Sequence, residues 1–375
     1  QMREKIPGRI LGYDISRPAV GIARENVAAS GLAKEIRLAR GDVLANLEAL
    51  KAMPVSPAQD GVTERIWHLL RIIGENIRQV KRPSNVSGIG CSSKTPGYFL
   101  KQSHGFNSVH GRMPSIATGA NLANHELTYL GVSGDGDTAS IGMGQFVHAV
   151  RRQLNVVYII ENNGTYGLTK GQFSATNDIE SKSKYGEDNL FPAIDLAGMA
   201  IHLGASFVAR SFSGDKEQLV PLMKAALRHK GFSLIDVISP CVTFNNHKHS
   251  TKSYDYVREH NDSVASMTDF VPIGNTITAS YKHGKNLDIS LHDGSILSLQ
   301  KISKNYNPEN KIEAIKKIQQ SEQQGKVLTG LLYINPKAKD LKEILDVVDT
   351  PLNKLVERDL CPGKEKINQI NSSLK

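Results

Sequence analysis

The sequence predicts an α/β fold with a parallel sheet covered by helices on both faces. From Val86 onward, apolar stretches of strand length alternate with stretches of helix length, and glycines separate them. Clusters of Gly, Asp and Asn directly follow the predicted strands, at the sheet edge where such folds bind ligands. With 375 residues, 39% hydrophobic and 22% charged, the chain can bury a core. This composition excludes a disordered tail, a fibrous repeat and a small disulfide scaffold.

The predicted elements follow one another along the chain as strand, helix, strand. In the central part we expect strands at 127–133, 156–161, 207–210 and 233–238, and helices at 141–152, 193–203 and 216–230. The C-terminal part predicts a polar hairpin of 287–292 with 296–299, a helix at 311–323 and a strand at 326–333. Because residues 264–375 hold no motif that indicates catalysis, we interpret them as an extension that docks another subunit.

The N-terminal part reads as a separate βαβ unit, with a strand, an Ala-rich helix and a second strand over residues 8–42. Residues 1–54 resemble a fragment of the AdoMet-dependent methyltransferases, in which Asp14 would match the acid that binds the ribose and Asp42 the acid near the adenine. No glycine-rich loop precedes the segment and no catalytic motif follows it, so an inert βαβ fragment is the favoured interpretation. A linker, 55–85, carries an amphipathic helix at 62–80 and leads into the main domain, 86–263.

Charge and cysteine content narrow the function classes. The net charge of +9 is spread over segments of mixed sign, so we expect no nucleic-acid partner, whereas an acidic protein such as a small electron carrier would suit a basic surface. No apolar stretch is long enough for a membrane span and no signal peptide is recognisable, which predicts a cytoplasmic protein without membrane contact. Three cysteines are too few for a disulfide framework and favour metal or redox chemistry.

Two motifs at neighbouring strand ends carry the chemistry. The motif Gly134-Asp135-Gly136-Asp137 follows one predicted strand, and Asn162-Asn163-Gly164 follows the next. Asn163 lies 28 residues after Asp135. A strand, a helix and a strand fit this interval, so both side chains should reach the same sheet edge. Asp135, Asn163 and the backbone carbonyl near Thr165 would offer hard oxygens to Mg²⁺, which keeps its other positions for a diphosphate and water. The glycines and the following helix N-terminus suit the anion, and together these features form a thiamine diphosphate signature.

Longer segments carry a closer resemblance. GIGCSSKTPGYF, HGRMPSIATGANLAN, GVSGDGDTASIGMGQFVHAVRR and ENNGTYGLTKGQFSAT, followed by SPCVTFNN and the late VDTPLN, are similar to the β subunit of the 2-oxoacid:ferredoxin oxidoreductases, most of all to the 2-oxoglutarate enzymes. The resemblance covers residues 86–375 and implies a thiamine-diphosphate-binding fold. It implies oxidative decarboxylation of a 2-oxoacid to an acyl-CoA with electrons passed to ferredoxin, and an α subunit that completes the active site.

The same resemblance implies roles for individual residues. It matches Asp135 and Asn163, with Thr165, to the magnesium ligands, and Gly134, Gly136 and Asp137 to the diphosphate loop. It matches His110, Gly111 and Arg112 to a turn beside the cofactor, and Lys94 and Lys170 to lysines that face the substrate carboxylate. Cys91 and Cys241 match two ligands of a four-iron cluster.

The chain departs from this family at one motif. A four-iron cluster takes four thiolates, and the Cys-x-x-Cys that supplies two of them is absent, while Cys361 stands far along the chain. We therefore expect substoichiometric iron. His247 and His249 form a further His-x-His pair, which we interpret as solvated.

Two alternatives stay open. The substrate could be pyruvate or a broad range of 2-oxoacids, or the chain could be a fusion that binds the cofactor but lacks electron transfer.

Overall fold

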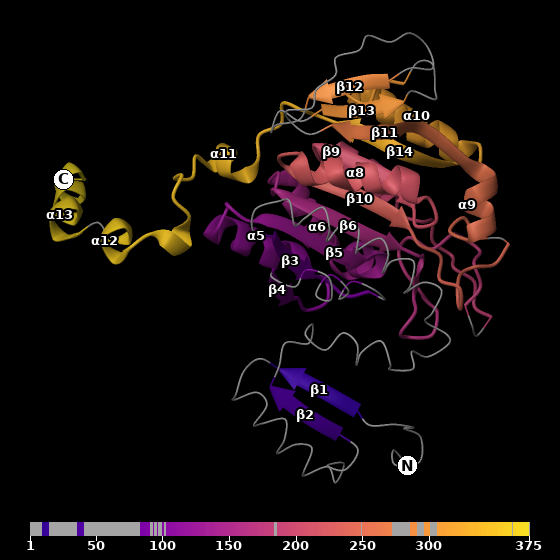
Figure 1. Cartoon of the computed structure of the whole chain (residues 1–375), viewed down its shortest axis with the longest axis horizontal. Coiled ribbons are helices and arrows are strands. Elements are labelled where there is room, and N and C mark those ends of the chain that lie inside the picture. Colours follow the sequence, from indigo (N-terminus) through magenta and orange to yellow (C-terminus); the bar gives the residue numbers. More distant parts are fainter. Residues whose placement is uncertain are drawn as a thin grey trace. The chain divides into compact units, whose positions relative to one another are not determined.

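The structure is a computed structural model (Figure 1). It describes residues 10–14, 36–40, 83–90, 93, 96, 100, 103–183, 186–248, 250–271, 286–290, 296–300, 306–361 and 363–374. The chain divides into two compact units, 1–57 and 58–375.

The first unit contains two parallel strands, β1 (Ile10–Asp14) and β2 (Ile36–Arg40), paired along their whole length. These are the two strands of the predicted βαβ unit, and Asp14 is the last residue of β1. Three other predicted features lie outside the described residues, namely the helix between these strands, Asp42 and the helix at 62–80.

The second unit is built on a ten-stranded sheet in the order β12-β13-β11-β14-β9-β10-β6-β5-β3-β4. Six neighbouring strands are parallel: β4 (His104–Asn107), β3 (Pro83–Ser87), β5 (Thr128–Gly134), β6 (Val156–Asn162), β10 (Phe232–Ile238) and β9 (Phe207–Phe212). The predicted parallel sheet is confirmed.

The rest of the sheet mixes directions. β14 (Val327–Ile334) runs antiparallel to β9, and β11 (Asn261–Val271) runs parallel to β14. β13 (Ile296–Gln300) and β12 (Asn286–Ser290) form the predicted hairpin. The segment after residue 264 therefore supplies strands to the central sheet, and β11 itself spans the predicted boundary at 264.

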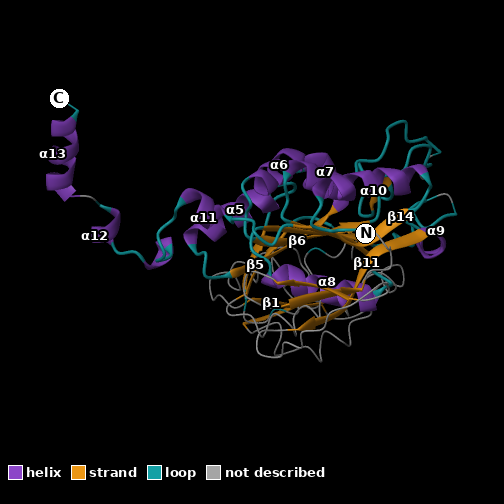
Figure 2. Ribbon diagram, turned by 90° about the horizontal axis from the view of Figure 1, so that it is seen from above, coloured by secondary structure: helices purple, strands orange, loops and turns teal. Residues whose placement is uncertain are grey.

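Helices cover both faces of the sheet, as predicted (Figure 2). One face packs against α8 (Lys216–Arg228). The other packs against α5 (Met113–Ala123), α6 (Met143–Arg151), α7 (Leu196–Leu203) and α10 (Lys311–Gln323). Because side chains alternate along a strand, Val157 and Ile159 of β6 face α8, whereas Tyr158 and Ile160 face the opposite layer.

The remaining elements are mostly short. They are β7 (Thr165–Tyr166), β8 (Gln172–Phe173), α9 (Tyr254–His260), α11 (Leu341–Leu345), the 3₁₀ turn Leu352–Lys354, α12 (Glu357–Leu360) and α13 (Gly363–Ser373). Among the helices of the described residues, none is both long and apolar enough to cross a bilayer.

Two predicted helices begin later than expected, each for a local reason. α7 starts at Leu196 because the side chain of Asp195 caps it, accepting hydrogen bonds from the backbone N–H of Ala197 and Gly198. α6 starts at Met143 because residues Gly136–Ile141 form a π-helix instead of an α-helical turn. The π-helix is described below because it carries site residues.

Candidate functional site

The two motif residues meet at the carboxyl edge of the sheet, as the spacing predicts. Asp135 directly follows β5 and Asn163 directly follows β6, and these strands are parallel neighbours with Gly134 opposite Glu161. The backbone N–H of Asn163 donates a hydrogen bond to Oδ1 of Asp135 at 3.3 Å. Adjacent strands thus bring together residues that are 28 positions apart.

Asp135 is buried and surrounded by donors. Its carboxylate is 2% exposed. Its Oδ2 accepts hydrogen bonds from the hydroxyls of Ser174 and Thr176, the latter at 2.6 Å. Burial raises the pKa of Asp135 above its usual value, and its side-chain and backbone hydrogen bonds act in the opposite direction. A buried carboxylate of this kind gains most when a cation binds beside it.

The donor set fits a magnesium ion with a diphosphate. Oδ1 of Asp135 accepts one hydrogen bond, and Oδ1 of Asn163 accepts one from the backbone N–H of Thr165 at 3.0 Å. Each of these oxygens has a second lone pair. Within the described part of the chain, no group of three or more acidic, His or Cys side chains could enclose a metal. One carboxylate with neutral oxygens is the sparse protein contribution that Mg²⁺ takes when phosphates and water complete its shell.

The second aspartate of the motif turns away from the first. Oδ1 of Asp137 accepts a hydrogen bond from the backbone N–H of Gly111 at 2.6 Å and lies against Nδ1 of His110. Its Oδ2 accepts from the hydroxyl of Ser133. Asp137 therefore ties the His110-Gly111-Arg112 turn to the end of β5, and Gly111 has a φ of +75° there. Arg112 is exposed and precedes the first residue of α5.

The glycines of the motif allow close approach of other parts of the protein. A Cβ on Gly134 would lie 3.0 Å from the carbonyl oxygen of Ile89, and one on Gly136 would lie 2.4 Å from Cζ of Tyr166. The hydroxyl of Tyr166 donates to the carbonyl of Gly136 at 2.9 Å. The described contacts of these glycines are thus with the chain itself, and they hold the loop compactly.

The hairpin of β7 and β8 presents Lys170. Thr165 begins β7 and is buried, and its hydroxyl donates to the carbonyl of Gln172 at 2.9 Å. Lys170 lies in the loop between the two strands, is exposed, and has a φ of +65°. A non-glycine residue in this conformation is strained, and such strain gathers at functional loops.

The remaining predicted residues are Lys94, the three cysteines, and His247 with His249. Cys91, Lys94 and His249 lie outside the described residues. Cys241 is half-buried, while Cys361 and His247 are exposed.

Sequence reasoning missed three polar residues. Ser174 and Thr176 follow β8 and donate hydrogen bonds to Asp135, which lies 39 and 41 residues before them in the sequence. Asn162, the first Asn of the pair, accepts from Thr176 at 3.0 Å. The only available signal was the density of small hydroxyl side chains after Phe173, and such a run is equally typical of a loop.

A comparison with protein families matches residues 88–237 to the thiamine pyrophosphate enzyme C-terminal TPP-binding domain. The match contains both motifs and confirms the predicted fold.

Curated relatives carry the name expected from the sequence. The chain is 44% identical over 162 residues to a 2-oxoacid:ferredoxin oxidoreductase subunit beta from a Sulfolobus species, which covers 43% of this chain and 53% of the relative. It is 41% identical over 162 residues to the 2-oxoglutarate oxidoreductase subunit KorB of Mycobacterium tuberculosis, covering 43% of each chain. The chain thus spans about half the length of the curated relatives it matches.

A solved structure is similar over a longer range. It is a 2-oxoglutarate:ferredoxin oxidoreductase from Magnetococcus marinus with 2-oxoglutarate, coenzyme A and succinyl-CoA bound. The match has a TM-score of 0.63 and 25% identity, and covers 85% of this chain and 93% of that one.

Proposed function

We propose that this chain, which carries a thiamine pyrophosphate-binding domain similar to those of 2-oxoacid:ferredoxin oxidoreductase β subunits, is the β subunit of such an enzyme. The proposed reaction is the oxidative decarboxylation of a 2-oxoacid to an acyl-CoA. The observation that carries the proposal is the meeting of Asp135 and Asn163 at the ends of β5 and β6, with lone pairs left for a metal.

The proposed metal ligands are Asp135, Asn163 and the backbone carbonyl of Thr165. Thiamine diphosphate, when bound, would supply the electron sink that loss of carbon dioxide requires. The protein residues bind and orient. Asp135 holds the cation that anchors the diphosphate, and Asp137 fixes the turn that carries His110, whose side chain is 33% exposed.

We assign the substrate carboxylate to Lys170 and Lys94. An ammonium group pairs with a carboxylate without a fixed geometry, so a mobile substrate can be captured. The exposed position of Lys170 in a strained loop at the carboxyl edge supports this role. We favour 2-oxoglutarate as the substrate because relatives and the Magnetococcus enzyme are named for it. Pyruvate or a broader range of 2-oxoacids is the alternative.

Partners follow from the same proposal. The α subunit would complete the active site, CoA would accept the acyl group and ferredoxin the electrons. Large apolar side chains stand exposed next to the site residues along the chain, which supports burial by another subunit: Val109 at 73%, Ile141 at 56% and Leu168 at 95%.

A second candidate function rests on the cysteine count. The sequence has three cysteines, whereas a four-iron cluster takes four thiolates. A chain that binds thiamine diphosphate but does not pass electrons is therefore the other candidate.

One experiment tests both candidates. The chain is co-purified with its α subunit, and ferredoxin reduction is measured with 2-oxoglutarate and CoA, together with iron content and thiamine diphosphate binding by calorimetry. Ferredoxin reduction supports the enzyme. Cofactor binding with neither iron nor ferredoxin reduction supports the second candidate, and absence of cofactor binding refutes both.

A further inference from the structure

A charged cluster lies behind Asp135, on the face of the sheet that packs against α7. On β6, β10 and β9, the alternate residues that point to this face include one polar residue each, which follows Ile160, Leu234 and Val208 respectively. The polar residues are Asn162, Asp236 and Arg210. Asp236 and Arg210 are directly opposite each other on neighbouring strands.

Arg210 joins two carboxylates. Its Nε donates to Oδ2 of Asp236 at 2.9 Å, and its Nη2 donates to Asp195 at the start of α7. Burial acts to lower the pKa of Arg210, but the charges and hydrogen bonds of the two aspartates outweigh it and raise the pKa. Asp236 is 1% exposed, so its carboxylate is fixed by Arg210 and cannot turn to solvent.

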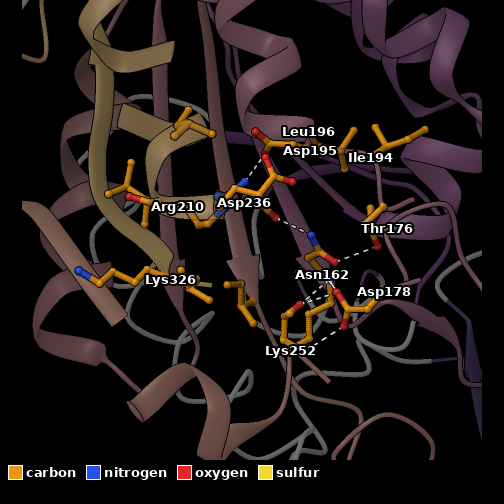
Figure 3. A pocket seen from close by; sticks show the side chains of 18 of the residues that line it. Asn162, Thr176, Asp178, Ile194, Asp195, Leu196, Arg210, Asp236, Lys252 and Lys326 are labelled. Atoms are coloured by element: carbon orange, nitrogen blue, oxygen red, sulfur yellow. Dashed lines mark hydrogen bonds and ion pairs between the residues drawn. The ribbon is translucent and has the colours of Figure 1, made fainter. Parts of the chain in front are cut away.

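The cluster reaches Asp135 through two uncharged side chains, Asn162 and Thr176, which Figure 3 shows beside Asp236. Nδ2 of Asn162 donates to Oδ1 of Asp236 at 3.1 Å. The hydroxyl of Thr176 lies 3.0 Å from Oδ1 of Asn162 and 2.6 Å from Oδ2 of Asp135. The chain of contacts runs from Arg210 to Asp236, Asn162, Thr176 and Asp135.

The direction of each contact is set by chemistry. The carboxylate of Asp236, paired with Arg210, accepts hydrogen bonds, so the amide of Asn162 presents its NH₂ group there. The carbonyl oxygen of Asn162 then faces Thr176. A reversed amide would point its donors at the hydroxyl and would place oxygen against oxygen at Asp236, which is repulsive.

We propose that Arg210 and Asp236 are positioning residues for the metal ligand Asp135. They fix the carbonyl oxygen of Asn162 beside the hydroxyl of Thr176, whose single proton is shared between that oxygen and Oδ2 of Asp135. The amide thereby sets where the hydroxyl stands against Asp135, whose Oδ1 is turned to the metal. This inference rests on the proposed function. Such outer partners orient metal ligands in many proteins, and their loss commonly costs 10- to 100-fold in metal affinity.

The surroundings make the cluster testable by substitution. Asn162, Thr176, Asp195, Arg210 and Asp236 all line one cavity of about 190 Å³. A change of hydrogen-bonding group at constant side-chain size therefore disturbs little packing beside this cavity.

The test measures Mg²⁺ affinity by calorimetry at saturating thiamine diphosphate, using the chain with its α subunit. Asp236→Asn is expected to raise the Mg²⁺ Kd about 10- to 100-fold. Asp195→Asn is the matched control. It removes the same charge from Arg210 and keeps a good helix cap, but it leaves Asp236 and Asn162 in place, so its Kd should stay within about threefold of wild type.

A double-substitution cycle separates positioning from general damage. Thr176→Val should weaken Mg²⁺ binding, Thr176→Ser should restore it, and adding Asp236→Asn to Thr176→Val should have almost no further effect, because residues acting in series are not additive. If Asp236→Asn does not fold, Arg210→Lys is measured instead. Lysine keeps the positive charge but lacks the planar guanidinium that donates to both aspartates.

The outcomes separate this inference from the proposed function. Equal Mg²⁺ affinities for Asp236→Asn and Asp195→Asn, or multiplicative effects of the substitutions at 236 and 176, overturn the positioning role. A wild-type complex that binds neither Mg²⁺ nor thiamine diphosphate overturns the proposed function itself.

Discussion

Replacement of Asp135 by Asn tests the centre of the site. Asp135 is the single carboxylate among the proposed ligands, since Asn163 and the carbonyl of Thr165 are neutral. Asn has the same shape, so the hydroxyls of Ser174 and Thr176 still have an oxygen to which they can donate. The amide NH₂ then takes the place of Oδ1 beside the backbone N–H of Asn163. The substitution therefore removes both the negative charge and the oxygen that is proposed to face the metal.

The size of the effect follows from the contacts. Loss of a residue that only orients a ligand commonly costs 10- to 100-fold in metal affinity, and Asp135 is proposed to touch the metal directly. We therefore expect the Mg²⁺ affinity to fall at least about 100-fold, which corresponds to about 2.7 kcal/mol. Thiamine diphosphate affinity should fall with it, because the diphosphate is held largely through the cation.

Calorimetry with Mg²⁺ and thiamine diphosphate measures both affinities. The control is Asp340→Asn, because Asp340 is also a buried aspartate, 7% exposed, and caps α11 close to the start of β6 instead of its end. The control should bind both ligands like wild type. Wild-type affinities in Asp135→Asn, measured on folded protein, would refute the assignment of Asp135 as a metal ligand.

Four further predictions follow from the structure. Lys170→Ala should lower kcat/KM for 2-oxoglutarate ten- to more than a hundredfold, from loss of about 1.5–3 kcal/mol, with thiamine diphosphate affinity unchanged in calorimetry; wild-type kinetics would remove Lys170 from the site. Gly142→Ala should destabilise the fold by about 1–3 kcal/mol in thermal unfolding, because the new Cβ would lie 2.6 Å from the carbonyl oxygen of Asp137, whereas Gly144→Ala meets nothing within 4 Å and should stabilise by about 0.5–1 kcal/mol. Because burial raises the pKa of Asp135, the metal-free fold should lose stability as pH rises from the ordinary value of 3.8 through the raised one, and urea unfolding should show this loss in wild type but not in Asp135→Asn. The purified chain should hold fewer than four irons, and four irons per chain by elemental analysis would contradict the argument from ligand count.

The sequence predicts the part of the site that depends on neighbouring strands. β5 and β6 are consecutive parallel strands, so the interval from Asp135 to Asn163 is enough to place both at one edge. The groups that support Asp135 follow no such rule. Ser174 and Thr176 reach it from beyond the β7–β8 hairpin, and only the folded chain brings them there.

The sheet shows the same division. Four of the six parallel strands, β5, β6, β9 and β10, could be predicted from the alternation of strand and helix. The strands β3 and β4, and the antiparallel placement of β14 beside β9, could not. Strand order depends on contacts between segments that are distant in the sequence, and the local hydrophobic pattern does not indicate these contacts. The sequence does contain one signal for the charged cluster. Asp236 is a charged residue inside the largely apolar strand FSLIDVI, and a buried charge needs a partner of opposite charge.

The π-helix at Gly136–Ile141 limits how the length of this segment can change. The backbone N–H of Gly142, which follows the π-helix, donates a hydrogen bond to the carbonyl of Asp137. This carbonyl lies five residues back, whereas an α-helix would use the one four residues back. If one residue of this segment were deleted, a regular α-helical turn could form in place of the π-helix. The residues before the deletion would then rotate by about 100° relative to α6, and Asp137 would no longer meet Gly111. Most surface turns tolerate a lost residue, whereas the length of this largely buried π-helix determines where Asp137 lies beside the proposed site.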